Sequence, residues 1–272
     1  MDTAVFVLIV NVIPPVYRGQ GLAAFMLAPT LAMALAPSFG MFIINRFDFV
    51  PLFLACAGLS LCAFFSSWKL KGQSRVGDEE EFPPDKEPFW ELKIIAPAGT
   101  SFLHNFVWGT LIAFIPLYVT ESGVSNPGYF FSAVAVMIII GRAVGAKIVD
   151  TYSKEKTVLT FISTSIIAMI LLSFSKTLPM FVLVGLLWGT GNAFFYPAIM
   201  SYAFEHAGSS GGPAVGTYRA LSDLGMALGP VIMGNVVSWT GYRAMFLWLA
   251  FACLINLVYF QFYVRRRKGA GL

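Results

Sequence analysis

The sequence predicts an all-α membrane protein with eight complete transmembrane helices and one partial helix. Hydrophobic residues make up 57% of the 272 residues and charged residues only 12%, which leaves too little polar surface to cover a soluble globule of this size. The apolar residues also form long runs, and a helix needs ~20 apolar residues to cross a bilayer core of ~30 Å. We therefore expect the chain to be embedded in lipid.

The predicted spans follow one another along the chain. Residues 3–13 form only half a span and are expected to be the tail of a truncated helix. The complete spans are expected at residues 20–44, 49–68, 93–119, 127–149, 156–175, 178–204, 213–238 and 242–264.

The segment 69–92 separates two groups of predicted spans. It mixes both signs of charge with proline and has few apolar residues to bury, so we expect a solvated linker. The predicted domains are a remnant of an N-terminal transmembrane half (1–68), the linker (69–92), a C-terminal six-helix transmembrane half (93–264) and a tail (265–272).

The basic residues predict the orientation of the chain. With eight complete spans, the loop at Arg18, the linker and the C-terminus share one side of the membrane. Most Lys and Arg residues fall on that side, whereas Arg46, Lys176 and Arg243 fall on the other. Because Lys and Arg are enriched in short cytoplasmic loops, we expect the linker and the C-terminus in the cytoplasm and the protein in the cell (plasma or inner) membrane. The net charge of +4 reflects this bias and does not indicate nucleic-acid binding.

A repeated pattern of small residues and proline indicates an internal duplication. It surrounds Pro37 and Pro230, which gives an offset of 193 residues (230 − 37). A repeat this long points to two homologous halves, and the offset implies that roughly 100 residues of the first half would precede Met1. Small residues let helices approach closely in lipid and proline bends a helix, so both segments are candidate hinges. The expected gating positions in them are Ala36, Pro37, Gly40, Gly225, Gly229, Pro230 and Gly234.

These features resemble the major facilitator superfamily of transporters. The two proline segments are similar to the G-P-x-x-G-G antiporter motif of that family's fifth helix and to its echo in the eleventh, and residues 14–19 are similar to the loop before the fifth helix. Residues 141–156 resemble the second copy of the family's G-x-x-x-D-R-x-G motif, in which Asp150 and the trailing lysines match. The resemblance implies helices five to twelve of a twelve-helix transporter, without its first three and a half helices. It looks most like the drug and metabolite efflux branch that exchanges substrate for protons.

Charged residues inside the predicted spans are candidates for binding or gating. Each costs ~2.5–3.5 kcal/mol at a helix centre on insertion scales, so each needs a partner or a function. Arg142 could hold an anionic substrate group or tie helix ends together. Asp223 could load and release a proton, or form a static pair with Arg219 four residues earlier. By the resemblance, Asp150 would latch the outward-facing state against the helix that starts after Arg18.

Uncharged polar residues occur in two spans that, by the resemblance, line the central cavity. His104 and Asn105 lie in the 93–119 span, and Asn192 lies in the 178–204 span. Histidine titrates near neutral pH, so His104 could bind substrate or a proton, or it could make an interhelical hydrogen bond. Nearby aromatic residues could form a substrate wall or pack against helices and lipid: Trp108, Phe114, Trp188, Phe194, Phe195 and Tyr196.

The leading functional hypothesis is a proton-coupled secondary transporter that exports a small organic molecule by alternating access. Its expected partners are the substrate, protons and the lipid bilayer, and the full-length protein is expected to be monomeric. Uptake by symport and an inactive or regulatory truncated membrane fragment remain alternatives. No enzyme, cofactor or metal site is expected, because no catalytic set or metal-ligand spacing occurs, and Cys56, Cys62 and Cys253 fall in apolar segments. Hinge prolines at matching places suit a rocking carrier better than a channel.

Overall fold

The chain divides into two compact units, Met1–Glu87 and Pro88–Leu272. The computed structural model describes residues 32, 35–37, 39–68, 92–151, 153–207 and 211–265. Every element in these ranges is a helix, which confirms the all-α fold class. Arg18, residues 69–91 of the expected linker and residues 266–272 of the tail lie outside the described residues, and the predictions for them stay predictions.

The described part of the first unit is a helix, a sharp turn and a second helix. Residues 39–47 are helical, and Asp48 then takes a positive φ of 79° while its amide donates to the Ile44 carbonyl at 3.1 Å. α3 follows at Phe49–Trp68, with the bounds predicted for the second complete span. Its side chains are mostly apolar on every side, and nearly all of those described are exposed, which is typical of a helix that crosses a membrane.

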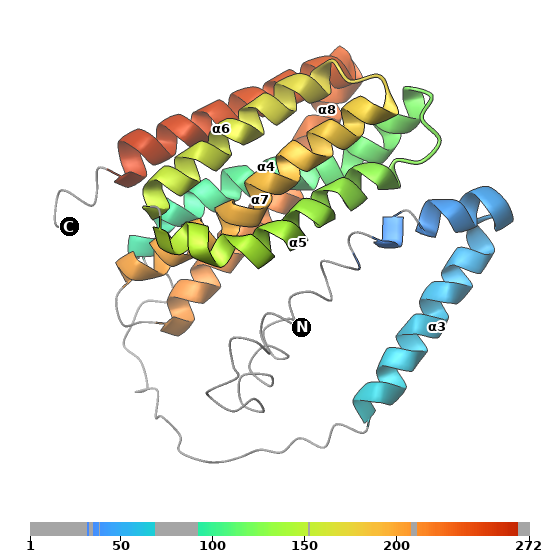
Figure 1. The fold of residues 1–272 in the computed structure, drawn as a ribbon, viewed down its shortest axis with the longest axis horizontal. Helices are drawn as coiled ribbons and strands as arrows, with labels where there is room; N and C mark the ends of the chain where they lie inside the picture. Colours follow the sequence, from blue (N-terminus) through green and yellow to red (C-terminus); the bar gives the residue numbers. More distant parts are fainter. Residues whose placement is uncertain are drawn as a thin grey trace. The chain divides into compact units, whose positions relative to one another are not determined.

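The second unit is a bundle of long helices. Its elements are α4 (Leu92–Glu121), α5 (Gly128–Thr151), α6 (Lys154–Ser173), α7 (Leu178–Ala207), α8 (Gly211–Tyr259) and the π-helix η2 (Phe260–Val264). α4 packs against α8, α5 packs against α7, and α6 packs against both α7 and α8 (Figure 1). Among the described residues, α3, α4, α6, α7 and α8 are long and apolar enough to cross a membrane, and α5 contributes a shorter apolar stretch over Gly128–Gly141.

α8 contains two helices that meet at Gly241. This glycine has φ 76° and ψ 172°, in a region that side chains with a Cβ rarely occupy. A Cβ at Gly241 would meet no atom within 4 Å, so the backbone conformation, and not crowding, accounts for glycine here. The two helices correspond to the spans predicted at 213–238 and 242–264.

The connection between α4 and α5 follows from its turn residues. Gly123 takes a positive φ of 80°, and its amide donates to Thr120 while the Val124 amide donates to Val119, both to carbonyl oxygens. This is how a glycine commonly ends a helix. Asn126 then accepts a hydrogen bond from the Gly128 amide at 2.8 Å, a local asparagine turn that starts α5.

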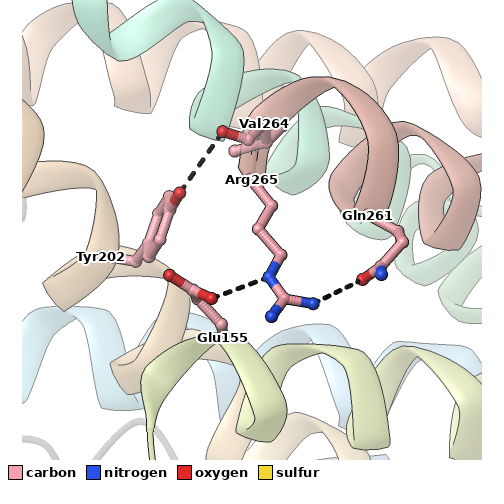
Figure 2. Close-up of polar contacts among 5 residues, drawn as sticks. All are labelled: Glu155, Tyr202, Gln261, Val264 and Arg265. Carbon is pink, nitrogen blue, oxygen red and sulfur yellow. Dashed lines mark hydrogen bonds and ion pairs between the residues drawn. The ribbon is translucent and has the colours of Figure 1, made fainter. Parts of the chain in front are cut away.

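One end of the second unit is held by polar contacts. Arg265 pairs with Glu155 in the first turn of α6, with 2.9 Å between Nε and Oε2, and its Nη1 donates to Gln261 Oε1 at 3.3 Å. The Tyr202 hydroxyl of α7 donates to the Val264 carbonyl at 3.4 Å. Figure 2 shows these contacts joining α6, α7 and the end of η2. They lie over an apolar core cluster: Ala96, Val158, Ile162, Phe195, Ala198, Ile199, Tyr202, Phe260 and Val264.

Candidate functional site

A buried polar contact joins α4 to α7. His104 Nε2 lies 2.9 Å from Asn192 Oδ1, and the two residues are 3% and 7% exposed. Both were predicted as candidate binding residues, and the structure brings them together although 88 residues separate them in the chain. Hydrogen bonds of this kind hold helices together in a membrane.

Aromatic rings surround the His104 imidazole. Trp188 and Phe195 stack on it with ring centroids 5.2 Å and 4.0 Å away, and Tyr196 meets it edge-on at 5.8 Å. Trp108 extends the cluster by stacking on Trp188 at 6.1 Å. Because His104 contacts rings and an uncharged amide inside the unit, this geometry favours the interhelical hydrogen-bond interpretation of the residue.

A second set of hydrogen bonds connects α4 to α7 and α8. The Tyr196 hydroxyl of α7 donates to Asn105 Oδ1, and Asn105 Nδ2 donates to the Ser101 carbonyl at 2.9 Å. The Ser101 hydroxyl donates to the Tyr218 hydroxyl of α8 at 2.5 Å. Asn105, Ser101 and Tyr218 are all buried. A continuous polar network therefore crosses three helices of an otherwise apolar bundle.

This network lies beside the charged residues of α8. Arg219 and Asp223 lie near the Tyr196 hydroxyl, and Arg219 also lies near that of Tyr218. Both charged residues are exposed, whereas Tyr218 and Ser222 on the same helix are buried. The structure records no ion pair between Arg219 and Asp223 among the residues it describes. At this point α8 turns Tyr218 and Ser222 inward and its two charged side chains outward.

The small residues of α8 form a close-packing face against α4. A Cβ at Gly225 would lie 2.2 Å from the Phe102 carbonyl oxygen, and a Cβ at Gly229 would lie 2.1 Å from that of Phe106. A Cβ at Gly109 of α4 would lie equally close, 2.1 Å from the Met226 carbonyl oxygen of α8. The expected close-packing face is therefore present within the second unit. Pro230 follows Gly229 directly, inside α8. Gly234 is not part of this tight packing, because a Cβ there would lie 3.6 Å from Phe114, an ordinary van der Waals distance.

The other predicted gating residues are less fully described. Ala36, Pro37 and Gly40 lie in helical residues of the first unit, where a Cβ at Gly40 would lie 3.9 Å from a Leu52 methyl. Arg142 and Asp150 lie on the backbone of α5, but their side chains are outside what the structure describes. Their gating or binding roles stay predictions.

The sequence did not single out Ser101 and Tyr218, which complete the polar network. Two spacings could have indicated them, because Ser101 lies one helical turn before His104 and Asn105, and Tyr218 directly precedes Arg219. Within the described ranges, no group of three or more His, Cys, Asp or Glu residues could hold a metal ion.

A protein-family model and several known proteins match most of the chain. A family model described as Major Facilitator Superfamily matches residues 1–212 and 150–271. The chain is 22% identical to the staphylopine export protein of Staphylococcus aureus (strain Mu50 / ATCC 700699) over 88% of its own length and 64% of that protein. It is 24% identical to the multidrug resistance protein MdtG of Enterobacter lignolyticus (strain SCF1) over 93% of its own length and 61% of that protein.

A solved structure has a similar fold. The crystal structure of the human organic anion transporter MFSD10 (TETRAN) matches with a TM-score of 0.54 and 18% sequence identity, over 61% of this chain and 40% of that one. At this identity the likeness concerns the fold alone. The chain spans less than two thirds of the length of these two curated relatives.

Proposed function

Because the chain belongs to the Major Facilitator Superfamily, a family of membrane transporters and not of enzymes, we propose that the full-length protein is a proton-coupled secondary transporter that exports a small organic molecule. The names of the staphylopine export protein and the multidrug resistance protein support export over uptake. In this proposal the second unit is one half of a carrier whose two halves rock around a site near the membrane midplane.

The exposed charges of α8 carry this proposal. Arg219 and Asp223 lie on a helix whose composition suits a membrane span, yet both face out of the second unit. Contact with lipid would cost each of them ~2.5–3.5 kcal/mol at the helix centre. A water-filled path or the other half of the carrier removes that cost, so we infer that this face of α8 lines the transport path.

Asp223 is the proposed proton carrier. Its carboxylate would take up a proton from one side of the membrane and release it on the other as the path alternates. Arg219 lies one helical turn away on the same exposed face of α8. Both residues lie near the Tyr196 hydroxyl, so the proposed proton site is close to the polar network that joins α4, α7 and α8.

The glycine and proline residues of α8 are the proposed hinge. Gly225 and Gly229 allow the backbones of α8 and α4 to lie in direct contact, and Pro230 removes one backbone donor at that point. Bending at this position would move the Arg219 and Asp223 face relative to α4. Matching roles are proposed for the first-unit residues Ala36, Pro37 and Gly40, and a latch is proposed for Asp150 and Arg18. Arg142 stays a proposed substrate-binding residue.

The orientation and setting of the protein are also proposals. The bias of Lys and Arg supports a cytoplasmic linker and C-terminus in a multi-pass protein of the cell membrane. The proposed partners are a small organic substrate, protons and the bilayer, with the full-length protein acting as a monomer.

Proteoliposomes containing the full-length protein test the proposal. An imposed pH gradient should drive accumulation of a probe from a panel that includes ethidium and staphylopine, and should fail to do so in Asp223→Asn. Glu155→Gln is the matched control, because it removes an acid on another helix, α6, which pairs with Arg265. Accumulation by the unmodified protein without a pH gradient, or equal gradient-driven accumulation in Asp223→Asn, would contradict proton coupling through Asp223.

A further inference from the structure

An apolar groove lies on the surface of the second unit between α6 and the end of α8. Its volume is about 280 Å³, and it is lined by Leu159 of α6 and by Leu257, Val258, Gln261 and Phe262 of α8 and η2. Val258 and Phe262 are 48% and 56% exposed, so the groove is open to the surface on the side of these two residues. Pockets for drug-sized ligands usually enclose ~300–1,000 Å³. A small, open, apolar groove suits a narrow flexible chain better than a compact ligand.

The groove leads to a basic side chain. Gln261 lines the groove and also accepts a hydrogen bond from Arg265 Nη1 at 3.3 Å. Arg265 is 44% exposed and holds Glu155 through Nε at 2.9 Å, as Figure 2 shows. A guanidinium has five N–H donors, so these two contacts leave donors for a ligand. In the sequence, Arg265 is followed by Arg266, Arg267 and Lys268.

We propose that this groove binds an acyl chain of an anionic phospholipid whose phosphate is bound by Arg265. Val258, Gln261 or Phe262, and Arg265 lie on successive turns of one helix face, so the apolar surface runs into the guanidinium as an acyl chain runs into its headgroup. Arginine matches phosphate in geometry and charge, and basic sites between transmembrane helices take anionic headgroups. A bound lipid would contact both α6 and α8 beside the Glu155–Arg265 pair.

Lipid titrations of the purified full-length protein test this site. Binding of phosphatidylglycerol and of phosphatidylethanolamine with the same acyl chains is measured by native mass spectrometry. Phosphatidylglycerol should bind more tightly, and Arg265→Gln should weaken it roughly fivefold, which is the contribution of one basic residue near an anionic lipid surface. Arg243→Gln removes the same charge at a distant position, where Arg243 stacks 4.5 Å over Phe174, and should leave phosphatidylglycerol binding unchanged.

Three further measurements separate a lipid site from a structural contact. Glu155→Gln breaks the ion pair but keeps Arg265, so phosphatidylglycerol binding should stay equal or increase. Val258→Trp fills the groove and should weaken the binding of both lipids. Glycerol phosphate, which has the headgroup charge without the chains, should not compete.

Five outcomes would overturn the proposal, and none of them depends on whether the protein transports protons. The first is equal affinity for the two lipids, and the next two are unchanged phosphatidylglycerol affinity in Arg265→Gln and in Val258→Trp. The other two are equal losses of affinity in Arg265→Gln and Glu155→Gln, and competition by glycerol phosphate. The last outcome would indicate a free-anion site.

Discussion

His104 Nε2 lies 2.9 Å from Asn192 Oδ1, so a hydrogen bond between two buried side chains joins α4 to α7. Trp188 and Phe195 stack on the imidazole of the same histidine, so the contact is enclosed within the second unit. The hydrogen bond connects α4 to α7 at this point, and its strength can be measured.

A double-mutant cycle measures that strength. His104→Ala and Asn192→Ala should each lower the free energy of unfolding. The double variant should show a coupling of about 0.6 kcal/mol, the average for interhelical hydrogen bonds in a membrane protein, and no more than about 1.7 kcal/mol, the largest value. Unfolding in denaturing detergent gives the energies. His104→Ala combined with Asn235→Ala, an exposed residue of α8, should be additive. Additivity in the His104–Asn192 cycle would show that the contact contributes nothing to the packing of α4 on α7.

The glycine face of α8 predicts a strong effect of one added methyl group. A Cβ at position 229 would lie 2.1 Å from the Phe106 carbonyl oxygen, so Gly229→Ala must push α8 away from α4. We expect a loss of about 1–3 kcal/mol, as for other overpacked sites. Gly216→Ala on the same helix is the control, because a Cβ there meets no atom within 4 Å and alanine favours a helix. In thermal unfolding in detergent, Gly229→Ala should melt at a much lower temperature than Gly216→Ala. Similar melting temperatures would contradict the close approach of α8 to α4.

Removal of one hydroxyl should weaken the polar network. Tyr196→Phe deletes the donor to Asn105 Oδ1 and leaves that buried acceptor without this partner, at a cost of about 1–3 kcal/mol. Tyr129→Phe, at an exposed position of α5, should cost much less. Chemical denaturation of the two variants measures their free energies of unfolding. A Tyr196→Phe variant as stable as Tyr129→Phe would show that the Tyr196–Asn105 hydrogen bond is energetically unimportant.

The proposed path predicts which face of α8 meets water. In a variant with Cys56, Cys62 and Cys253 replaced by serine or alanine, Asp223→Cys should react with a membrane-impermeant maleimide, because residue 223 is exposed. Ser222→Cys should be protected, because residue 222 is only 6% exposed. Labelling is measured in intact membranes that contain the full-length protein. Protection of position 223 with labelling of position 222 would place the wrong face of the helix in the path.

The extent of each helix could be predicted from the sequence. The span predicted at 49–68 coincides with α3, and the span predicted at 178–204 lies within α7, because the length of an apolar run and the residues that interrupt it are local properties. The break between the last two predicted spans appears at Gly241 for the same reason. The all-α fold follows from these runs.

The partners inside the site could not be predicted in the same way. His104 and Asn192 were both identified as candidates, but their contact depends on how α4 and α7 are rotated about their axes. The Ser101–Tyr218 hydrogen bond was missed because serine and tyrosine are common in membrane helices and nothing local marks this pair. Similarly, the sequence placed Arg219 and Asp223 on one helix face, but only the packing of α8 on α4 turns that face outward.

Comparison of substrate exchange with proton-driven accumulation in Asp223→Asn is the most direct test of the central claim. If Asp223 carries the proton, inverted vesicles with this variant should exchange labelled for unlabelled probe at close to the unmodified rate, because exchange needs no net proton movement. The same vesicles should fail to accumulate that probe under a pH gradient. Proton-driven accumulation equal to that of the unmodified protein would contradict the account.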